Sequence, residues 1–410
     1  MRKNRNYFLT ILILAALPAI SLGSEKEVEF AAIYPLSGPV VEMGQNAKRG
    51  IELAVEEINQ AGGIQALGGA KLKAIWYDTE SKPEAGRSVA ERACEKGAAA
   101  IIGAVQSNVT LLTTTVAEKN KKPHLVCAAV ADTITERGYQ YTFRVLPSGG
   151  MLVMGVVEFL NYMREKSGKK FDKLVVFHED GPYGKSYFDG YSAFSKKFGF
   201  NILAGLGYPA ATHDLTAIVT KGKALNPDFV MHVGYLTDAV LLLRSMKEQK
   251  FNALGVHGSG GFAEEKFISS MGKDAEYIFA DVSFSPLIDA PGAPKGRNKL
   301  LQEKSIKKYG VPMTHHTAFA FTSVYILKDA LERAKSTEGK ELRDAIARTD
   351  LMGDRGNILP YEKIKFNEKG QNIFAKVPVA QIQRGEQIPI FPAAVATAQP
   401  PFPIPKWEER

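Results

Sequence analysis

Short apolar segments alternate along the chain with longer segments whose apolar residues recur every three or four positions. The first kind occupies residues 28–34, 71–77, 98–104 and 124–129, and the second kind occupies residues 44–63, 82–97 and 108–120. The first kind has the length and composition of buried strands, and the second has the period of amphipathic helices. Buried strands that alternate with such helices predict a parallel sheet covered by helices on both faces.

The same alternation starts again after the segment LPSGG at 146–150. Its predicted strands are residues 173–178, 201–208, 228–234 and 253–258, with helices between them. Further helices are expected at about 295–308 and 314–335, and the last strands in EKIKFN and AKVPVAQIQ. The sequence therefore predicts an α/β protein with two similar lobes. Residues 396–410 are rich in proline and lack periodicity, which predicts a loose tail.

The first 23 residues differ from the rest of the chain. Arg2, Lys3 and Arg5 precede the apolar stretch LTILILAALPAI, and small residues follow it. This order is typical of a secretory signal peptide, and we expect cleavage after Ser21 or Gly23. An uncleaved anchor is the alternative, but the stretch is short for a helix that spans a membrane. Since no cysteine follows it, we expect an exported protein that is not a lipoprotein.

Charge and cysteine content exclude several kinds of partner and site. The net charge is +8, and three of the positive charges lie in the signal peptide. The other basic residues are spread along the chain, whereas a nucleic-acid partner would require a basic patch. The two cysteines, Cys94 and Cys127, fall in a predicted helix and a predicted buried strand. We expect both thiols to be buried and unpaired, although an exported compartment permits disulfides.

The sequence contains no motif that argues for catalysis. No nucleophile elbow, phosphate loop or dinucleotide fingerprint is present. HED at 178–180 closes an apolar strand, where a turn and one polar contact are commoner than acid–base chemistry. His315 and His316 mark the start of a helix, and adjacent helical residues point in different directions, so this pair should be a poor chelate. We therefore expect no enzyme activity, no cofactor and no metal; an exported hydrolase would need a nucleophile–base pair.

The loops after the predicted strands favour a binding cleft. Open α/β sheets bind ligands at the carboxyl ends of their strands. Loops rich in small residues lie there in the first half, at 34–44, 77–86, 103–110 and 127–135. Helix N-termini in such loops attract carboxylates. Tyr183, Tyr235 and Phe262 follow strands of the second half, where aromatic rings can cover an apolar ligand. Ordinary turns, caps and interlobe packing remain the alternative for each single feature.

Several segments carry a family resemblance. They are AAIYPLSGPVVEMGQNAKRGIELAVEEINQAGGI, AIIGAVQSNVT, TERGYQYTFR, VVFHEDGPYGKSYFDGY and FVMHVGYLTDAVLLLRSMKEQ. Over residues 28 to 395 the chain resembles type I periplasmic binding proteins of the branched-chain amino-acid branch, which serve ABC importers. The resemblance implies two Rossmann-like lobes with parallel-type sheets that close over a ligand by a hinge motion, and a membrane permease as partner. The resemblance also implies a periplasmic location. We expect a monomer, and a sensory receptor domain on the same fold is the alternative function.

The resemblance also implies domain boundaries. After the signal peptide at 1–23, the N-terminal lobe would comprise residues 24–148 and 285–353. The C-terminal lobe would comprise residues 149–284 and 354–395, and the tail residues 396–410. Hinge crossings would then lie near 147–150, 281–286 and 351–356.

Ligand-binding residues follow from the same resemblance, position by position. Ser107 matches a serine that binds the ligand carboxylate, Ala128 and Ala129 match main-chain contacts, and Tyr235 matches a tyrosine of the second lobe. The resemblance adds Met43, Val130 and Gly260, whereas Tyr183 and Phe262 are expected ligand contacts because they follow strands of the second half.

Three of these positions depart from the family pattern, and one of them is Met43, which stands at an aromatic position. Val130 stands where the family has a threonine hydroxyl, and Gly260 lies where an acid would pair with the ligand ammonium. A buried ammonium without a carboxylate is costly. Either the ligand is an amino acid whose ammonium meets another acid, such as Asp180 or Glu42, or it is a carboxylate or amide without a tightly bound amino group.

Overall fold

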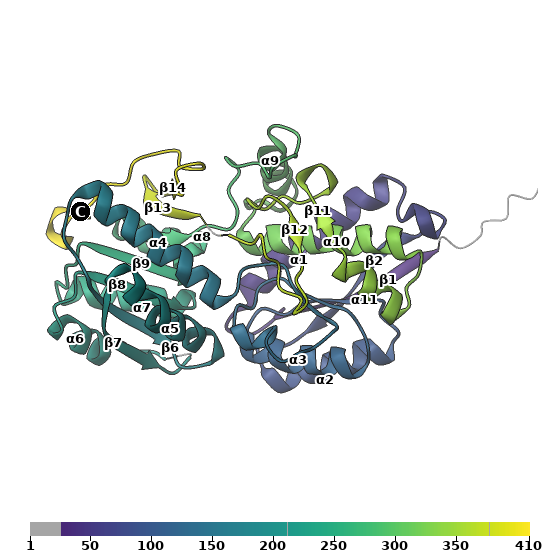
Figure 1. The fold of residues 1–410 in the computed structure, drawn as a ribbon, viewed down its shortest axis with the longest axis horizontal. Helices are drawn as coiled ribbons and strands as arrows, with labels where there is room; N and C mark the ends of the chain where they lie inside the picture. Colours follow the sequence, from purple (N-terminus) through teal and green to yellow (C-terminus); the bar gives the residue numbers. More distant parts are fainter. Residues whose placement is uncertain (1–25, 211, 377) are drawn as a thin grey trace, which may run out of the picture.

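The computed structural model describes residues 26–210, 212–376 and 378–410, and shows two α/β lobes side by side (Figure 1). The first lobe contains a five-stranded parallel sheet in the order β2-β1-β3-β4-β5. Its strands are β1 Glu27–Tyr34, β2 Lys71–Asp78, β3 Ile101–Gly103, β4 His124–Val126 and β5 Thr142–Arg144. The predicted signal peptide lies outside the described residues.

Helices cover both faces of the first sheet, and strand β1 shows why. Phe30, Ala32 and Tyr34 join the core cluster that includes α1, while Ala31 and Ile33 join the cluster of α2 and α3. Alternate side chains of one strand thus fill two separate cores. The helices are α1 Val41–Gln60, α2 Pro83–Glu95, α3 Ser107–Lys119, α9 Arg297–Tyr309, α10 His315–Ala334 and α11 Gly339–Ala347.

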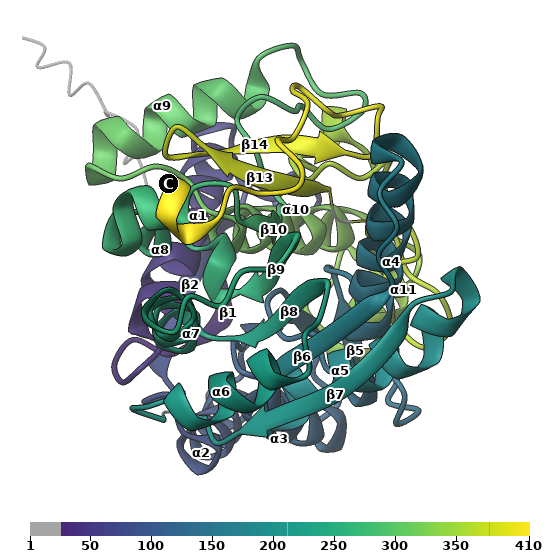
Figure 2. The same cartoon turned by 90° about the vertical axis from the view of Figure 1, so that its left-hand side faces the viewer.

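The second lobe contains a seven-stranded sheet in the order β14-β13-β10-β9-β8-β6-β7 (Figure 2). Its strands are β6 Lys173–Glu179, β7 Asn201–Tyr208, β8 Phe229–Gly234, β9 Gly255–Gly260, β10 Phe279–Asp281, β13 Val379–Gln383 and β14 Glu386–Phe391. Its helices are α4 Gly149–Ser167, α5 Pro182–Phe194, α6 Thr216–Ala224, α7 Leu236–Glu248 and α8 Glu265–Met271. Strand β13 is antiparallel to β10 and to β14, and the other pairings are parallel. The predicted fold class is confirmed.

The chain passes between the lobes three times, and the third passage corrects the sequence prediction. It leaves the first sheet after Arg144 and returns after Asp281. Strand β12 Ile364–Lys365 pairs with β11 Asp350–Leu351, and Gln371 still bridges to Arg144 of the first sheet. The third crossing therefore lies between Gln371 and Val379, after the predicted 351–356, so residues 354–371 stay with the first lobe.

Contacts across the cleft hold the lobes together. The Ser186 hydroxyl of α5 donates to the Asp132 carboxylate at 2.5 Å and accepts from the Asp132 N–H at 3.0 Å. Lys266 of α8 forms an ion pair with Glu42 of α1 at 3.3 Å. The structure is thus a closed arrangement of the two lobes. Among the described residues no helix is long and apolar enough to span a membrane.

The two cysteines are unpaired, as predicted, but they differ in burial. Cys94 is only partly buried. Cys127 is buried, and its Sγ lies 2.8 Å from the Tyr34 hydroxyl. Burial raises the pKa of Cys127 to about 11, so this thiol stays protonated at neutral pH.

The expectation of a loose tail is wrong. Ile404 and Trp407 are buried against the second lobe. The Ile404 N–H donates to the Leu254 carbonyl at 3.0 Å, and the Trp407 indole N–H donates to the Phe251 carbonyl at 2.8 Å. Sequence periodicity missed this contact because the tail docks through isolated apolar residues between prolines.

Trp407→Phe is expected to lower the free energy of unfolding by about 1–2 kcal/mol, since it leaves the Phe251 carbonyl without its donor and removes buried volume. Denaturant titration measures this loss. The matched control is Trp76→Phe, because Trp76 is the other tryptophan and makes no hydrogen bond through its indole among the described residues. Equal losses for the two variants would contradict a docked tail.

Candidate functional site

A cavity lies between the lobes at the carboxyl ends of their strands. Its volume is about 80 Å³ on a scale where one water needs roughly 10–15 Å³, so it suits a small ligand. Eight of the nine predicted site residues line it: Met43, Ser107, Ala128, Ala129, Val130, Tyr183, Tyr235 and Gly260. The residues that the sequence did not single out as its lining are Val105, Leu146, Pro147, Leu152, Tyr187, Ala263, Asp281, Ser283, His315, His316 and Phe319.

Ser107 offers an anion seat on the first lobe. It is the first residue of α3, whose N-terminal N–H groups and dipole favour a negative charge. The Ser107 hydroxyl oxygen accepts from the Ala131 N–H at 3.3 Å, which leaves its own proton available to a ligand. The seat suits a carboxylate.

The turn after β4 is held from behind by a buried arginine. Arg144 donates to the Ala131 carbonyl at 2.6 Å, to the Thr135 hydroxyl at 2.8 Å and to the Gln371 side chain at 2.6 Å. Burial lowers the pKa of Arg144 to about 10, so it remains charged at neutral pH. These bonds fix the main chain next to Ala128, Ala129 and Val130, where small side chains let a ligand approach it.

Three tyrosines form the wall contributed by the second lobe. The ring centroids of Tyr183 and Tyr235 lie 5.5 Å apart, as do those of Tyr183 and Tyr187. Burial raises the pKa of all three well above its ordinary value, so the hydroxyls are neutral. Neutral phenols can cover an apolar body and still hydrogen bond to a ligand.

An acid absent from the sequence-based site lines the cavity. Asp281 ends β10, next to β9, and its Oδ1 lies 3.2 Å from His257 Nε2. The Ser259 hydroxyl donates to Asp281 Oδ2. Asp281 Oδ1 has no hydrogen-bond partner among the described residues, because the close His257 contact lacks hydrogen-bond alignment. The carboxylate of a cavity-lining residue therefore keeps acceptor capacity that no described residue uses.

Gly260 cannot carry the acid itself. A Cβ built there would lie 2.4 Å from the Tyr183 hydroxyl and 2.5 Å from the Gly234 carbonyl, and Gly260 has a φ of +68°. The Tyr183 hydroxyl fills the space that a side chain at 260 would need. The neighbouring strand supplies the carboxylate instead.

Phe262 does not line the cavity, contrary to the sequence prediction. Its ring is fully buried and packs against His232, at 5.0 Å between centroids, and against Phe267, at 4.6 Å. The turn at Gly260 directs this ring into the core of the second lobe, where it supports the cavity wall from behind.

The other acids considered from the sequence lie outside the lining. Glu42 pairs with Lys266, and Asp180 does not line the cavity. Glu179 accepts from the N–H groups of Gly181 at 2.6 Å and Gly184 at 2.7 Å, so it binds the N-terminus of α5. HED thus forms a turn with polar contacts.

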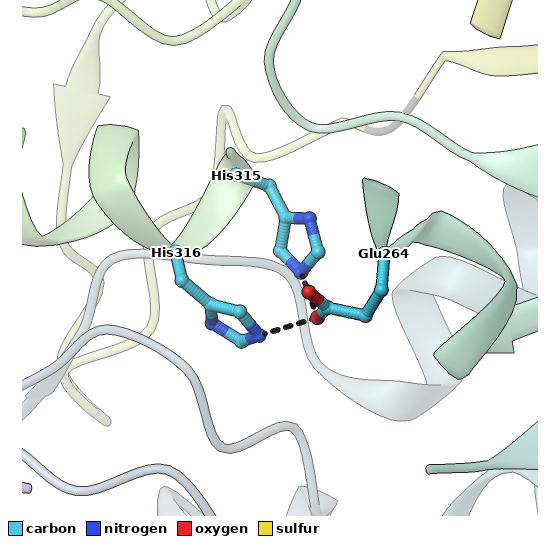
Figure 3. A group of neighbouring side chains, drawn as sticks. All are labelled: Glu264, His315 and His316. Carbon is cyan, nitrogen blue, oxygen red and sulfur yellow. Dashed lines mark ion pairs between the residues drawn. The ribbon is translucent and has the colours of Figure 1, made fainter. Parts of the chain in front are cut away.

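A second group of titratable residues borders the cavity (Figure 3). His315 and His316 both direct Nε2 toward Glu264 Oε1, at 3.7 and 3.2 Å. Burial, and then the neighbouring His316, lower the pKa of His315 to about 3. Burial raises the pKa of Glu264, but the contacts with His316 and His315 outweigh it, and the result lies below the ordinary value. The prediction that the two rings diverge is wrong, because both bend toward one carboxylate of the other lobe.

Comparison with known proteins places the chain in a family. Residues 27–387 match a family model described as periplasmic binding protein. The chain belongs to the periplasmic binding protein family. It is a binding protein and not an enzyme. Leu/Ile/Val-binding protein homolog 7 of Brucella melitensis is 28% identical to it over 396 residues, which cover 95% of this chain and 98% of the relative.

Solved structures share the fold of this binding protein. The branched-chain amino acid transporter substrate binding protein LivJ of Streptococcus pneumoniae, in complex with isoleucine, aligns with a TM-score of 0.76 and 22% identity. The alignment covers 88% of this chain and 98% of LivJ. An ABC transporter substrate-binding protein of Desulfitobacterium hafniense in complex with Leu has a TM-score of 0.72 and 21% identity, and the coverages are 88% and 99%.

Proposed function

We propose that this periplasmic binding protein is the substrate-binding component of an ABC importer, and that its cavity holds an α-amino acid with an apolar side chain such as leucine, isoleucine or valine. The observation that carries the proposal is the pairing of an anion seat at Ser107 with a carboxylate at Asp281 in one small cavity. An amino acid carries the two complementary charges.

The remaining lining suits an apolar side chain. Met43, Val105, Leu146, Leu152 and Phe319 offer hydrocarbon surface and no charge. Burial of a leucine side chain against such surface contributes about 1.5–3 kcal/mol. In the sequence, Val130 and Gly260 indicated that a ligand ammonium would lack its usual partners. Asp281 supplies an acid in the same cavity, so an ammonium group is compatible with it. A carboxylate or amide without an amino group is therefore not favoured.

The proposal also includes how the protein is exported and how it acts once it has bound a ligand. The signal peptide is removed on export to the periplasm, the mature protein acts as a monomer, and closure of the lobes over the ligand creates the surface that a membrane permease recognises.

Isothermal titration calorimetry on tag-free protein that begins at residue 24, after dialysis from denaturant to remove any bound ligand, tests the ligand class. We expect micromolar binding of leucine, isoleucine or valine. The controls for leucine are 4-methylpentanoate, which lacks the amino group, and 3-methylbutylamine, which lacks the carboxylate. Analogue binding as tight as that of leucine would contradict the proposal.

Ser107→Ala is expected to weaken leucine binding about tenfold, because a hydrogen bond to a charged group contributes about 1.5 kcal/mol. Calorimetry measures the change, and the matched control is Ser270→Ala, an exposed serine outside the cavity. If Ser107→Ala binds leucine as tightly as Ser270→Ala does, the carboxylate is bound elsewhere.

A further inference from the structure

The group formed by Glu264, His315 and His316 draws its members from both lobes. Glu264 precedes the first residue of α8 in the second lobe, and the two histidines are the first residues of α10 in the first lobe. One oxygen or nitrogen from each of the three lies within 4.8 Å of those of the others. The group is thus complete only when the lobes are closed.

Other contacts fix the backbone near each half of the group. Thr314 and Thr317 form a reciprocal cap at the start of α10, and α1 approaches this turn so closely that a Cβ at Gly50 would lie 2.1 Å from the Thr317 carbonyl oxygen. On the other lobe, Phe262 and Phe267, which flank Glu264 in sequence, are buried and pack on each other. Donors held in this way need little rearrangement to meet an ion.

Two donor atoms of this group are buried without a partner. Glu264 Oε1 and His316 Nε2 make no hydrogen bond to any described residue, although they lie 3.2 Å apart. The separation is short, but the atoms are not aligned for a hydrogen bond. Leaving a buried polar atom without a partner is unfavourable. A cation between these atoms would satisfy both lone pairs.

The donor set identifies the class of cation. Two imidazoles and one carboxylate are the protein ligands of several zinc sites that keep a fourth position open. Zinc ligands about 2.0–2.1 Å from the metal lie roughly 3.4 Å apart in a tetrahedron. The observed separations of 3.2 and 3.7 Å bracket that value. Imidazole ligands also favour zinc and its neighbours over magnesium and calcium, which prefer oxygen.

We propose that Glu264, His315 and His316 form an interlobe binding site for Zn²⁺. His315 and His316 also line the amino-acid cavity, so the site borders it. The ion joins the lobes through ligands of both and stabilises the closed form. The site goes beyond the proposed capture of an amino acid and does not depend on it.

The test titrates ZnCl₂ into tag-free, chelator-treated mature protein and follows the heat of binding. We expect one Zn²⁺ per chain. Glu264→Gln in the second lobe and His316→Gln in the first should each weaken Zn²⁺ binding tenfold or more, since even residues that only support metal ligands contribute about 10- to 100-fold. Each variant is first checked for an unchanged circular dichroism spectrum and cooperative thermal unfolding.

The matched control is His213→Gln, an exposed histidine outside the group, which should bind Zn²⁺ like the wild type. Loss of binding in the variants of both lobes supports the site. Absence of Zn²⁺ binding, retention of binding in Glu264→Gln, or an equal loss in His213→Gln overturns it. Leucine titrations on the same wild-type preparation separate the two proposals. If the protein binds Zn²⁺ but not leucine, only the amino-acid proposal is refuted. If it binds leucine but not Zn²⁺, only the metal site is refuted.

Discussion

Asp281→Asn is expected to weaken leucine binding by about 30-fold or more. Asp281 lines the cavity, and its carboxylate has one oxygen without a hydrogen-bond partner among the described residues. Removing one partner of a buried, hydrogen-bonded charge pair costs about 2–5 kcal/mol. The amide keeps the size of the side chain but offers an ammonium group no negative charge. Calorimetry with leucine measures the loss.

A comparison of two ligands shows whether the effect is on the ammonium. The wild type should prefer leucine strongly over 4-methylpentanoate, which differs by the amino group, and Asp281→Asn should lose most of that preference. The Ser259 hydroxyl also donates to Asp281, so a merely structural role is the competing explanation. Such a role predicts that both ligands weaken by the same factor, and that outcome would refute Asp281 as the ammonium partner.

Much of the fold could be predicted from the sequence because the strands of a parallel sheet are buried on both faces. Short, mostly apolar segments such as 28–34 and 228–234 are distinct from the amphipathic helices between them. Elements that lack this contrast were missed: β5 has three residues, and α8 has seven. The third crossing was also misplaced, since the contact of Gln371 with Arg144 joins residues far apart in sequence.

The first-lobe part of the site was predictable because its residues follow their strands directly. The rule that parallel strands end at one edge of the sheet predicts the loops that hold Ser107 and Ala129, and the family resemblance then selects these two residues. Asp281 was not found because family likeness directs attention to the loop after β9, whereas the acid ends β10. An acid that closes the apolar segment YIFAD was the available signal. His315 and His316 converge on Glu264, which lies in the other lobe, 51 positions before His315 in the sequence. A pattern of neighbouring residues cannot predict a contact over that separation.

Placing an acid at position 260 is expected to reduce both the stability of this protein and its leucine binding. Gly260→Glu should lower the free energy of unfolding by about 3 kcal/mol or more and abolish leucine binding. A positive φ in a residue with a side chain costs about 1–3 kcal/mol, and overpacking adds about 1–3 kcal/mol. The clash is with the Tyr183 hydroxyl, which belongs to a cavity-lining residue, and with the Gly234 backbone.

Two further variants separate the causes. Gly138→Glu places the same side chain at a φ of +74° with no atom within 4 Å of the new Cβ, so it reports backbone strain and added charge alone. Gly260→Ala adds the clash without the charge, and should destabilise more than Gly138→Ala when both are measured by denaturant titration. If Gly260→Glu instead unfolds at the wild-type denaturant concentration and binds leucine as tightly, position 260 has room for an acid. We assign the ammonium to Asp281 because the Tyr183 hydroxyl excludes a carboxylate from the end of β9. That result would contradict the exclusion and remove this reason for the assignment.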